Sequence, residues 1–210
     1  DILNLSVAEA LGNSLRTLLV AATLSLLMAW WLSRKRVGLF VLLPIGISPV
    51  VFGLAALVLS GYLPLGVAGS WLLLPLVQAV FLTPLAFQVL APARRALSSD
   101  ILEAAALDGA GRTQTLWHIE LPSLAKPVAV AIALVSVASL GEFGAASFLA
   151  YGSQETLPLV MFRLMSRPGG DNLGMAMAAA SLFILVAFAV VWAVSSLRED
   201  VPAREESTRG

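Results

Sequence analysis

The chain has 210 residues, of which 59% are hydrophobic and 12% are charged, and its formal net charge is zero. That charged share is about half of what a soluble domain carries, so the composition excludes an ordinary soluble domain, and the zero net charge gives no general attraction to nucleic acid. The absence of cysteine excludes disulfides and thiolate metal sites.

The apolar residues occur in long blocks, and a block of about eighteen or more with few charges predicts a membrane-spanning helix. Five blocks are long enough, and they run from about Leu11 to Leu32, Gly38 to Leu59, Trp71 to Leu90, Val128 to Leu149 and Leu173 to Leu197. We therefore expect an all-α membrane domain over residues 1–197 with five core transmembrane helices. Residues 198–210 are charged and lack apolar periodicity, which predicts a disordered tail.

The distribution of lysine and arginine predicts the orientation of these spans. Basic residues gather in the first connection at 34–36, around the third connection, and in the tail. With five crossings these regions share one side, which the positive-inside tendency makes cytoplasmic. The other side holds only Arg163 and Arg167, with Arg16 near the start of the first span. We therefore expect the N-terminus outside and the tail in the cytoplasm.

Prolines interrupt two of the predicted spans. Pro44 and Pro49 lie in the second span, and Pro75 and Pro84 lie in the third. Membrane helices tolerate proline where neighbouring groups satisfy the freed carbonyls. The prolines therefore indicate either ordinary kinks or broken helices that line a path.

A polar insert, "SSDILEAAALDGAGRTQTLWHIELPSLAKP", runs from Ser98 to Pro127 on the predicted cytoplasmic side. Asp100 and Glu103 have the spacing of a capping pair, and Gly109 suits the left-handed residue that ends a helix. A second short helix is expected to stop at Pro122. Leu102, Ala106 and Gly109 share one face of the first helix, beside Ala105, and this ridge of small side chains fits either docking into a groove of a partner or a solvated loop helix.

The insert resembles the EAA signature of ABC importer permeases. That signature is E-A-A-x3-G-x9-I-x-L-P, and its positions are occupied by Glu103, Ala104, Ala105, Gly109, Ile119, Leu121 and Pro122, with Asp108 also typical. The resemblance implies a type I importer permease in which the loop at 93–127 forms coupling helices. It further implies an ATPase dimer, a second permease half or a fused N-terminal half, an extracytoplasmic substrate-binding protein, and the bacterial cytoplasmic (inner) membrane.

The substrate is less specified than the family. The segments "NSLRTLLVAATLSLLMAWWLSRKR", "SLGEFGAASFL" and "TLPLVMFRLM" most resemble the C-terminal half of fused permeases for ferric iron or thiamine. Such a half would also explain a first residue other than methionine. Molybdate and sulfate permeases carry similar "GEFGA" segments, so an oxyanion importer is the alternative. An ATP-independent channel or secondary transporter is an alternative from another class, although it would not need this loop.

The chain carries no set of residues typical of catalysis. Lys35 and Lys126 both lie outside any Walker A pattern, so we expect ATP and magnesium to bind to the partner ATPase and no cofactor to bind here. His118 is the single histidine, and one histidine without cysteine offers no convincing metal-ligand cluster. We expect His118 to be a surface or interface residue of the loop.

Glu142 is an ionisable residue within or near the fourth span, where such a group usually faces a cavity or a partner. Gly141 and Gly144 beside it would permit a bend or the close approach of another backbone. The segment therefore predicts either a lining of the translocation path or its gate, or a carboxylate that pairs with another helix. Downstream, residues Leu157 to Met165 form a short amphipathic run, which fits a membrane-surface helix or a docking surface for the binding protein.

Overall fold

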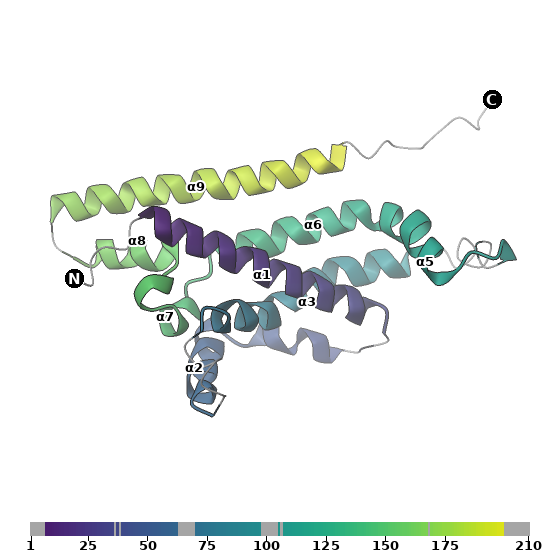
Figure 1. Ribbon diagram of the computed structural model, residues 1–210, viewed down its shortest axis with the longest axis horizontal. Helices are drawn as coiled ribbons and strands as arrows, with labels where there is room; N and C mark the ends of the chain where they lie inside the picture. Colours follow the sequence, from purple (N-terminus) through teal and green to yellow (C-terminus); the bar gives the residue numbers. More distant parts are fainter. Residues whose placement is uncertain are drawn as a thin grey trace.

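The structure is a computed structural model that describes residues 7–35, 37, 39–62, 70–97, 105, 107–167 and 169–199. Every regular element among these residues is a helix, which confirms the all-α prediction. The four long helices are α1 (Val7–Ser33), α3 (Leu73–Arg95), α6 (Leu121–Leu140) and α9 (Gly170–Glu199). They lie lengthwise beside one another, with α7 and α8 at one end of the bundle and α5 at the other (Figure 1).

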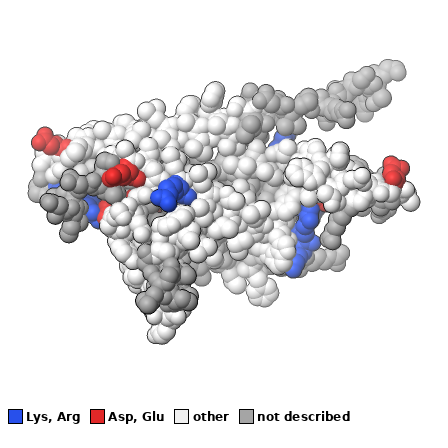
Figure 2. Space-filling model, in the orientation of Figure 1, with Lys and Arg blue, Asp and Glu red and all other residues white. Residues whose placement is uncertain are grey.

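Within the part of the chain that the structure describes, four helices are long and apolar enough to cross a membrane: Val7–Ser33, Leu73–Arg95, Thr113–Leu140 and Gly170–Val194. A fifth crossing exists if the bent pair Phe40–Gly46 and Pro49–Ser60 counts as one span. Lysine, arginine, aspartate and glutamate gather toward the two ends of the bundle and leave its flanks largely uncharged (Figure 2). The bundle is therefore built to expose apolar flanks to lipid or to a second apolar protein.

The second predicted span is wrong as a continuous helix. Its residues form a 3-10 helix, η1 (Leu39–Gly46), and an α-helix, α2 (Pro49–Ser60), and the two are bent by 101°. Pro49 occupies the first turn of α2, where its missing N–H is harmless, and the Ser48 hydroxyl accepts a hydrogen bond from the Val50 N–H at 3.3 Å. These residues start a new helix, so the predicted break in the helix occurs here, while the lining of a path stays a prediction.

The third and fourth predicted spans also shift. In α3 the helix continues past Pro75 and Pro84 without a break and ends at Arg95. The fourth helix ends at Leu140 instead of Leu149, because Gly141 caps it and the chain turns before the short α7 (Ala146–Leu149). The first and last predicted spans agree with α1 and α9 within a few residues.

Pro122 does not stop the second helix of the insert, which corrects that prediction. The chain runs helically from α5 (Arg112–Thr115) through a π-helical turn, η2 (Leu116–Glu120), into α6. The Leu121 N–H bonds to the Leu116 carbonyl five residues back, so the hydrogen-bond register widens just before the proline. A widened turn of this kind relieves the clash of a proline ring with the preceding turn. The part of the insert from Arg112 onward is thus a direct extension of a membrane helix.

Small side chains let the central helices approach closely. Buried alanines in α1, α3 and α6 pack with a few larger residues, and they include Ala21, Ala29, Ala86 and Ala131. Where lipid surrounds a bundle, close backbone approach replaces the hydrophobic effect as the main attraction between helices. The helix α9 packs on α6 and α8 through Ala176 and Ala179, while Ile184, Leu185 and Phe188 remain exposed.

Candidate functional site

The turn that ends the first helix of the insert is formed as expected. Gly109 has φ of 76°, and the Ala110 N–H donates to the Ala105 carbonyl at 2.9 Å. This six-residue closure with a left-handed glycine is a standard helix end, so the conformation predicted for Gly109 is confirmed. Glu103 and Ala104 lie outside the described residues.

Exposure at this turn differs from the expected pattern. Ala105 is only 8% exposed and contacts its own chain, whereas Leu107 is 89% exposed. Asp108 and Gly109 are exposed beside Leu107. Leu107 is therefore the exposed apolar side chain of this turn, and the alanine-ridge argument did not single it out. The signal available in the sequence was a leucine directly before Asp108 and Gly109.

A shallow cavity of about 430 Å³ lies behind this turn. It is lined by Asp108, Gly109 and Ala110 on one side and by Gln114, Thr115, His118 and Ile119 on the other. His118 is exposed, and its Nδ1 lies 3.0 Å from the Gln114 carbonyl. Of the predicted coupling residues, Asp108, Gly109 and Ile119 thus line one cavity, while Leu121 and Pro122 lie in the first turn of α6.

Glu120 joins three helices at the same end of the bundle. Its Oε2 atom lies 2.8 Å from Arg34 Nη2 at the end of α1 and 2.9 Å from Arg94 Nη1 at the end of α3. The Arg94 guanidinium carbon lies 4.2 Å from the centre of the Trp30 ring. Sequence reasoning singled out Ile119 and Leu121 but not Glu120 between them, because only the folded chain brings the two arginines to this carboxylate.

Glu142 directs its carboxyl group back into its own chain. The Ala145 and Ala146 N–H groups donate to it at 2.6 and 3.1 Å, and Gln78 Nε2 of α3 lies 3.4 Å away. The Ser139 hydroxyl in turn donates to the side-chain Oε1 atom of Gln78 at 2.6 Å. Glu142 is 6% exposed. The carboxyl group caps the start of α7 and anchors this turn to α3.

Gly141, Glu142 and Gly144 lie together on one wall of a cavity of about 510 Å³. The opposite walls are mostly apolar and come from Pro49, Val50, Phe81, Leu82 and Leu85. The broken helix α2 presses on this turn, since a Cβ atom on Gly144 would stand 2.9 Å from the Val50 nitrogen. The fold thus brings the three predicted gate residues against the one bent helix pair.

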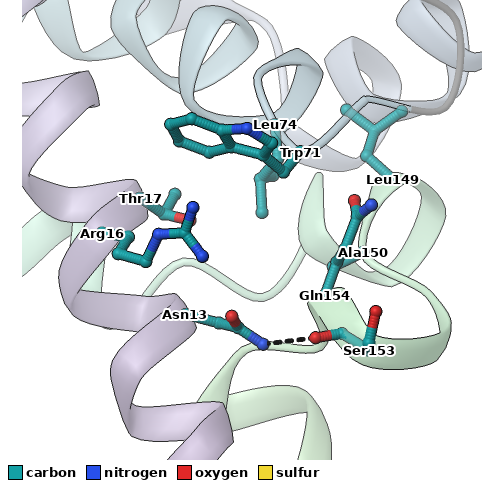
Figure 3. A pocket seen from close by; sticks show the side chains of 9 residues that line it. All are labelled: Asn13, Arg16, Thr17, Trp71, Leu74, Leu149, Ala150, Ser153 and Gln154. Carbon is teal, nitrogen blue, oxygen red and sulfur yellow. Dashed lines mark hydrogen bonds between the residues drawn. The ribbon is translucent and has the colours of Figure 1, made fainter.

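A third cavity, of about 230 Å³, lies between α1, the start of α3 and η3 (Gly152–Gln154). Figure 3 shows Arg16 and Thr17 pointing into it from α1, opposite Gln154 and below Trp71. Asn13 closes its floor by donating to the Ser153 carbonyl at 2.8 Å and the Glu155 carbonyl at 3.1 Å. Sequence reasoning used Arg16 only to count charges.

The helix α8 (Leu157–Met165) has the bounds predicted for the amphipathic run. Leu157, Leu159 and Val160 are buried against the bundle, and Phe162 and Met165 are exposed. Glu155 before this helix forms an ion pair with Arg163 within it. Across the described residues, no group of three or more histidine, aspartate or glutamate side chains is placed to hold a metal ion.

Comparison with known proteins gives a match over most of the chain. Residues 21–199 match the family model described as "Binding-protein-dependent transport system inner membrane component". The "Probable transport system permease protein NifC" of Clostridium pasteurianum is 28% identical over 182 residues, which are 79% of this chain and 62% of that protein. The chain therefore spans less than two thirds of that relative.

Two further relatives are named for their substrates. The "Molybdenum transport system permease protein ModB" of Escherichia coli (strain K12) is 31% identical over 163 residues, covering 68% of this chain and 71% of the relative. The "Sulfate transport system permease protein CysW" of Synechococcus elongatus is 32% identical over 130 residues, covering 56% of this chain and 46% of the relative.

Proposed function

This chain belongs to the family of binding-protein-dependent transport system inner membrane components, and we propose that it is the permease of an ATP-driven importer for a tetrahedral oxyanion of the molybdate or sulfate class. The observation that carries the substrate class is the identity of the relatives, two of which are named for molybdenum and sulfate transport. The expected preference for ferric iron or thiamine finds no counterpart among the relatives named above, so the oxyanion alternative replaces it.

The polar turn at residues 107–109 is the proposed contact with a separate ATPase, which would bind ATP and magnesium. Leu107, Asp108 and Gly109 are exposed there, and an exposed apolar side chain beside an acidic one suits a groove on a partner. The helical path from Arg112 to Leu140 has no interruption, so a displacement of this turn would be carried into the membrane core. Glu103, Ala104 and Ala105 would support the turn from the preceding helix.

The turn at residues 141–145 is the proposed lining of the path or its gate. It packs on α2 and faces a cavity, and two arrangements of a packed interface can act as a switch. Glu142 would hold the turn in one arrangement, with its hydrogen bonds to Ala145 and Ala146. Its role would then be positioning, with no direct contact to the transported ion.

The remaining partners follow from the family resemblance. A second permease half, or a fused N-terminal half, would cover the apolar flank that α9 and neighbouring helices expose. An extracytoplasmic binding protein would deliver the ion at the end that carries α8. In this orientation the N-terminus lies outside, and Arg34, Arg94 and Arg95 lie at the cytoplasmic end, in keeping with the positive-inside tendency.

The proposal is tested by uptake in cells that express the full-length permease with its ATPase and binding protein. We expect permease-dependent uptake of labelled molybdate or sulfate, with no permease-dependent uptake of ferric iron or thiamine. Uptake of iron or thiamine alone would overturn the substrate class. Uptake that persists without a functional ATPase would instead favour a channel or a secondary transporter.

A further inference from the structure

We propose that the cavity beside Arg16 is a binding site for a small oxyanion, which a transported ion occupies before it enters the bundle. The site lies between α1, Trp71 at the start of α3, and the loop that holds Ser153 and Gln154 (Figure 3). The inference rests on the proposed function and adds a residue and a place for the oxyanion within this chain.

The charge of the cavity favours an anion. Its nine lining residues include one cation, Arg16, and no carboxylate. The ion pairs found among the described residues engage Arg34, Arg94 and Arg163 and leave Arg16 without a carboxylate partner there. The guanidinium carbon of Arg16 instead lies 4.7 Å from the centre of the Trp71 ring. An aromatic face attracts a cation but offers no oxygen acceptor. The N–H groups at the edge of the guanidinium therefore stay available for hydrogen bonds to an anion.

The position of Arg16 on α1 also calls for a polar environment. Arg16 is the tenth residue of a helix that is long and apolar enough to span a membrane, and it is exposed in this bundle. A guanidinium within a membrane span is costly in lipid and usually faces a water-filled cavity or an ionic partner. The cavity supplies such a place, since its wall includes polar side chains of Asn13, Thr17, Ser153 and Gln154.

The size and chemistry of the cavity fit an inorganic oxyanion. Its volume of about 230 Å³ is below the range of roughly 300–1,000 Å³ that is typical of pockets for drug-sized ligands. The planar guanidinium can donate two parallel hydrogen bonds to two oxygens of one anion. Thr17, next to Arg16 in α1, also lines the cavity and adds a hydroxyl donor. The site thus offers one positive charge, on the Arg16 guanidinium, and neutral hydrogen-bond donors. It would bind an oxyanion without neutralising all of its negative charge, which suits a site that must also release the ion.

The walls of the cavity connect it to the proposed gate. Leu149, the last residue of α7, and Ala150, which follows it, line the cavity. The first residues of that helix donate to the Glu142 carboxyl group. An ion at Arg16 would therefore lie against the segment that Glu142 positions, at the end of the bundle where the binding protein is proposed to dock.

The test measures binding of labelled molybdate by equilibrium dialysis, with the full-length permease and its ATPase in nanodiscs and without the binding protein. We expect Arg16→Gln to weaken binding by on the order of tenfold or more, because it removes charged hydrogen bonds. Arg16→Lys should bind with intermediate affinity, since it keeps the charge but loses the fork. Arg167→Gln is the matched control: Arg167 is exposed and lies two residues after the end of α8, outside the lining of the cavity, so its replacement should leave binding unchanged.

Three results would overturn the inference. The first is that the wild-type permease does not bind molybdate. The second is that Arg16→Gln and Arg167→Gln weaken molybdate binding equally, which would indicate a general effect of surface charge. The third is intact molybdate binding by Arg16→Gln with weaker capture of the loaded binding protein, which would make Arg16 a contact for a carboxylate on that protein. Thermal unfolding of each variant, with Arg16→Lys as the conservative change, separates lost binding from lost folding.

The uptake assay described above separates this inference from the proposed function. If cells import molybdate or sulfate through the permease while dialysis finds no binding that depends on Arg16, the oxyanion function stands and the site is wrong. If cells import neither ion, the substrate class fails and the inference fails with it.

Discussion

Gly53 of α2 lies so close to Ala145 that a Cβ atom at position 53 would stand 2.6 Å from the Ala145 Cα atom. Both residues are buried, and the contact is backbone against backbone, so no flexible side chain is available to move aside. This contact fixes the second half of the bent helix pair on the turn that carries Glu142. The packing of that turn therefore depends on a glycine that is more than ninety residues away in the chain.

We expect Gly53→Val to destabilise the permease by about 1–3 kcal/mol, because it overpacks a backbone contact that cannot relax. The measurement is the apparent melting temperature of the purified full-length permease in detergent. Gly12→Ala is the control, since nothing lies within 4 Å of a Cβ atom at position 12 and alanine favours the helix. A normal melting temperature for Gly53→Val would show that α2 does not pack on this turn.

Replacement of Glu142 by alanine should destabilise the turn by about 2 kcal/mol, because the Ala145 and Ala146 N–H groups lose their acceptors in a buried place. Glu142→Gln keeps one oxygen acceptor, so it should lie between alanine and wild type in melting temperature. Uptake and transport-coupled ATPase activity are measured on the same preparations. Wild-type uptake by both variants would remove Glu142 from the mechanism.

Glu120→Ala should destabilise the permease by about 2 kcal/mol, because it leaves Arg94, whose side chain is 13% exposed, without its carboxylate. Arg34→Ala should have a smaller effect, since Arg34 is more exposed and Glu120 then retains Arg94. Melting temperatures compare the two variants. The double variant Arg94→Met with Glu120→Leu should recover most of the loss, and failure to recover would assign the effect to packing instead of charge.

A crosslinker at position 107 should capture the ATPase in native vesicles. These 210 residues contain no cysteine, so Leu107→Cys adds one reactive thiol at the most exposed point of the proposed coupling turn. Tyr151→Cys is the control, because Tyr151 is exposed near α7 and α8, away from that turn. Equal capture of the ATPase from both positions, or capture from position 151 alone, would contradict the proposed orientation and contact.

Gly109→Ala should weaken the coupling of ATP hydrolysis to uptake, because a Cβ atom strains the left-handed backbone at φ of 76° by about 1 kcal/mol. The bulkier Gly109→Trp should uncouple the two activities while the spans remain inserted. The measurement is the ratio of ions imported to ATP hydrolysed. Gly111→Ala is the control, since only the flexible end of Gln114 lies near a Cβ atom there. Normal coupling in Gly109→Trp would count heavily against the coupling role.

Local sequence signals predicted much of this protein. Apolar blocks of sufficient length predicted α1, α3 and α9 within a few residues at most ends, because helix formation in lipid depends mainly on composition and length. The glycine at position 109 and the run from Leu157 to Met165 were also predicted, since a left-handed helix end and an amphipathic stripe are properties of neighbouring residues. The resemblance of the insert to the EAA signature predicted the family, because all positions of that signature lie within one short segment.

The tertiary structure decided what depends on residues far apart in the chain. The bend between Gly46 and Pro49 is stabilised by contact of α2 with residues 144 and 145. The ion pairs of Glu120 require the ends of α1 and α3. The cavity beside Arg16 requires a loop that lies some 140 residues later in the chain. Sequence reasoning placed the fourth helix end nine residues too late and did not predict the burial of Ala105. Composition alone does not show where a capping carboxyl group or a buried contact ends a helix, because both are made by the folded chain.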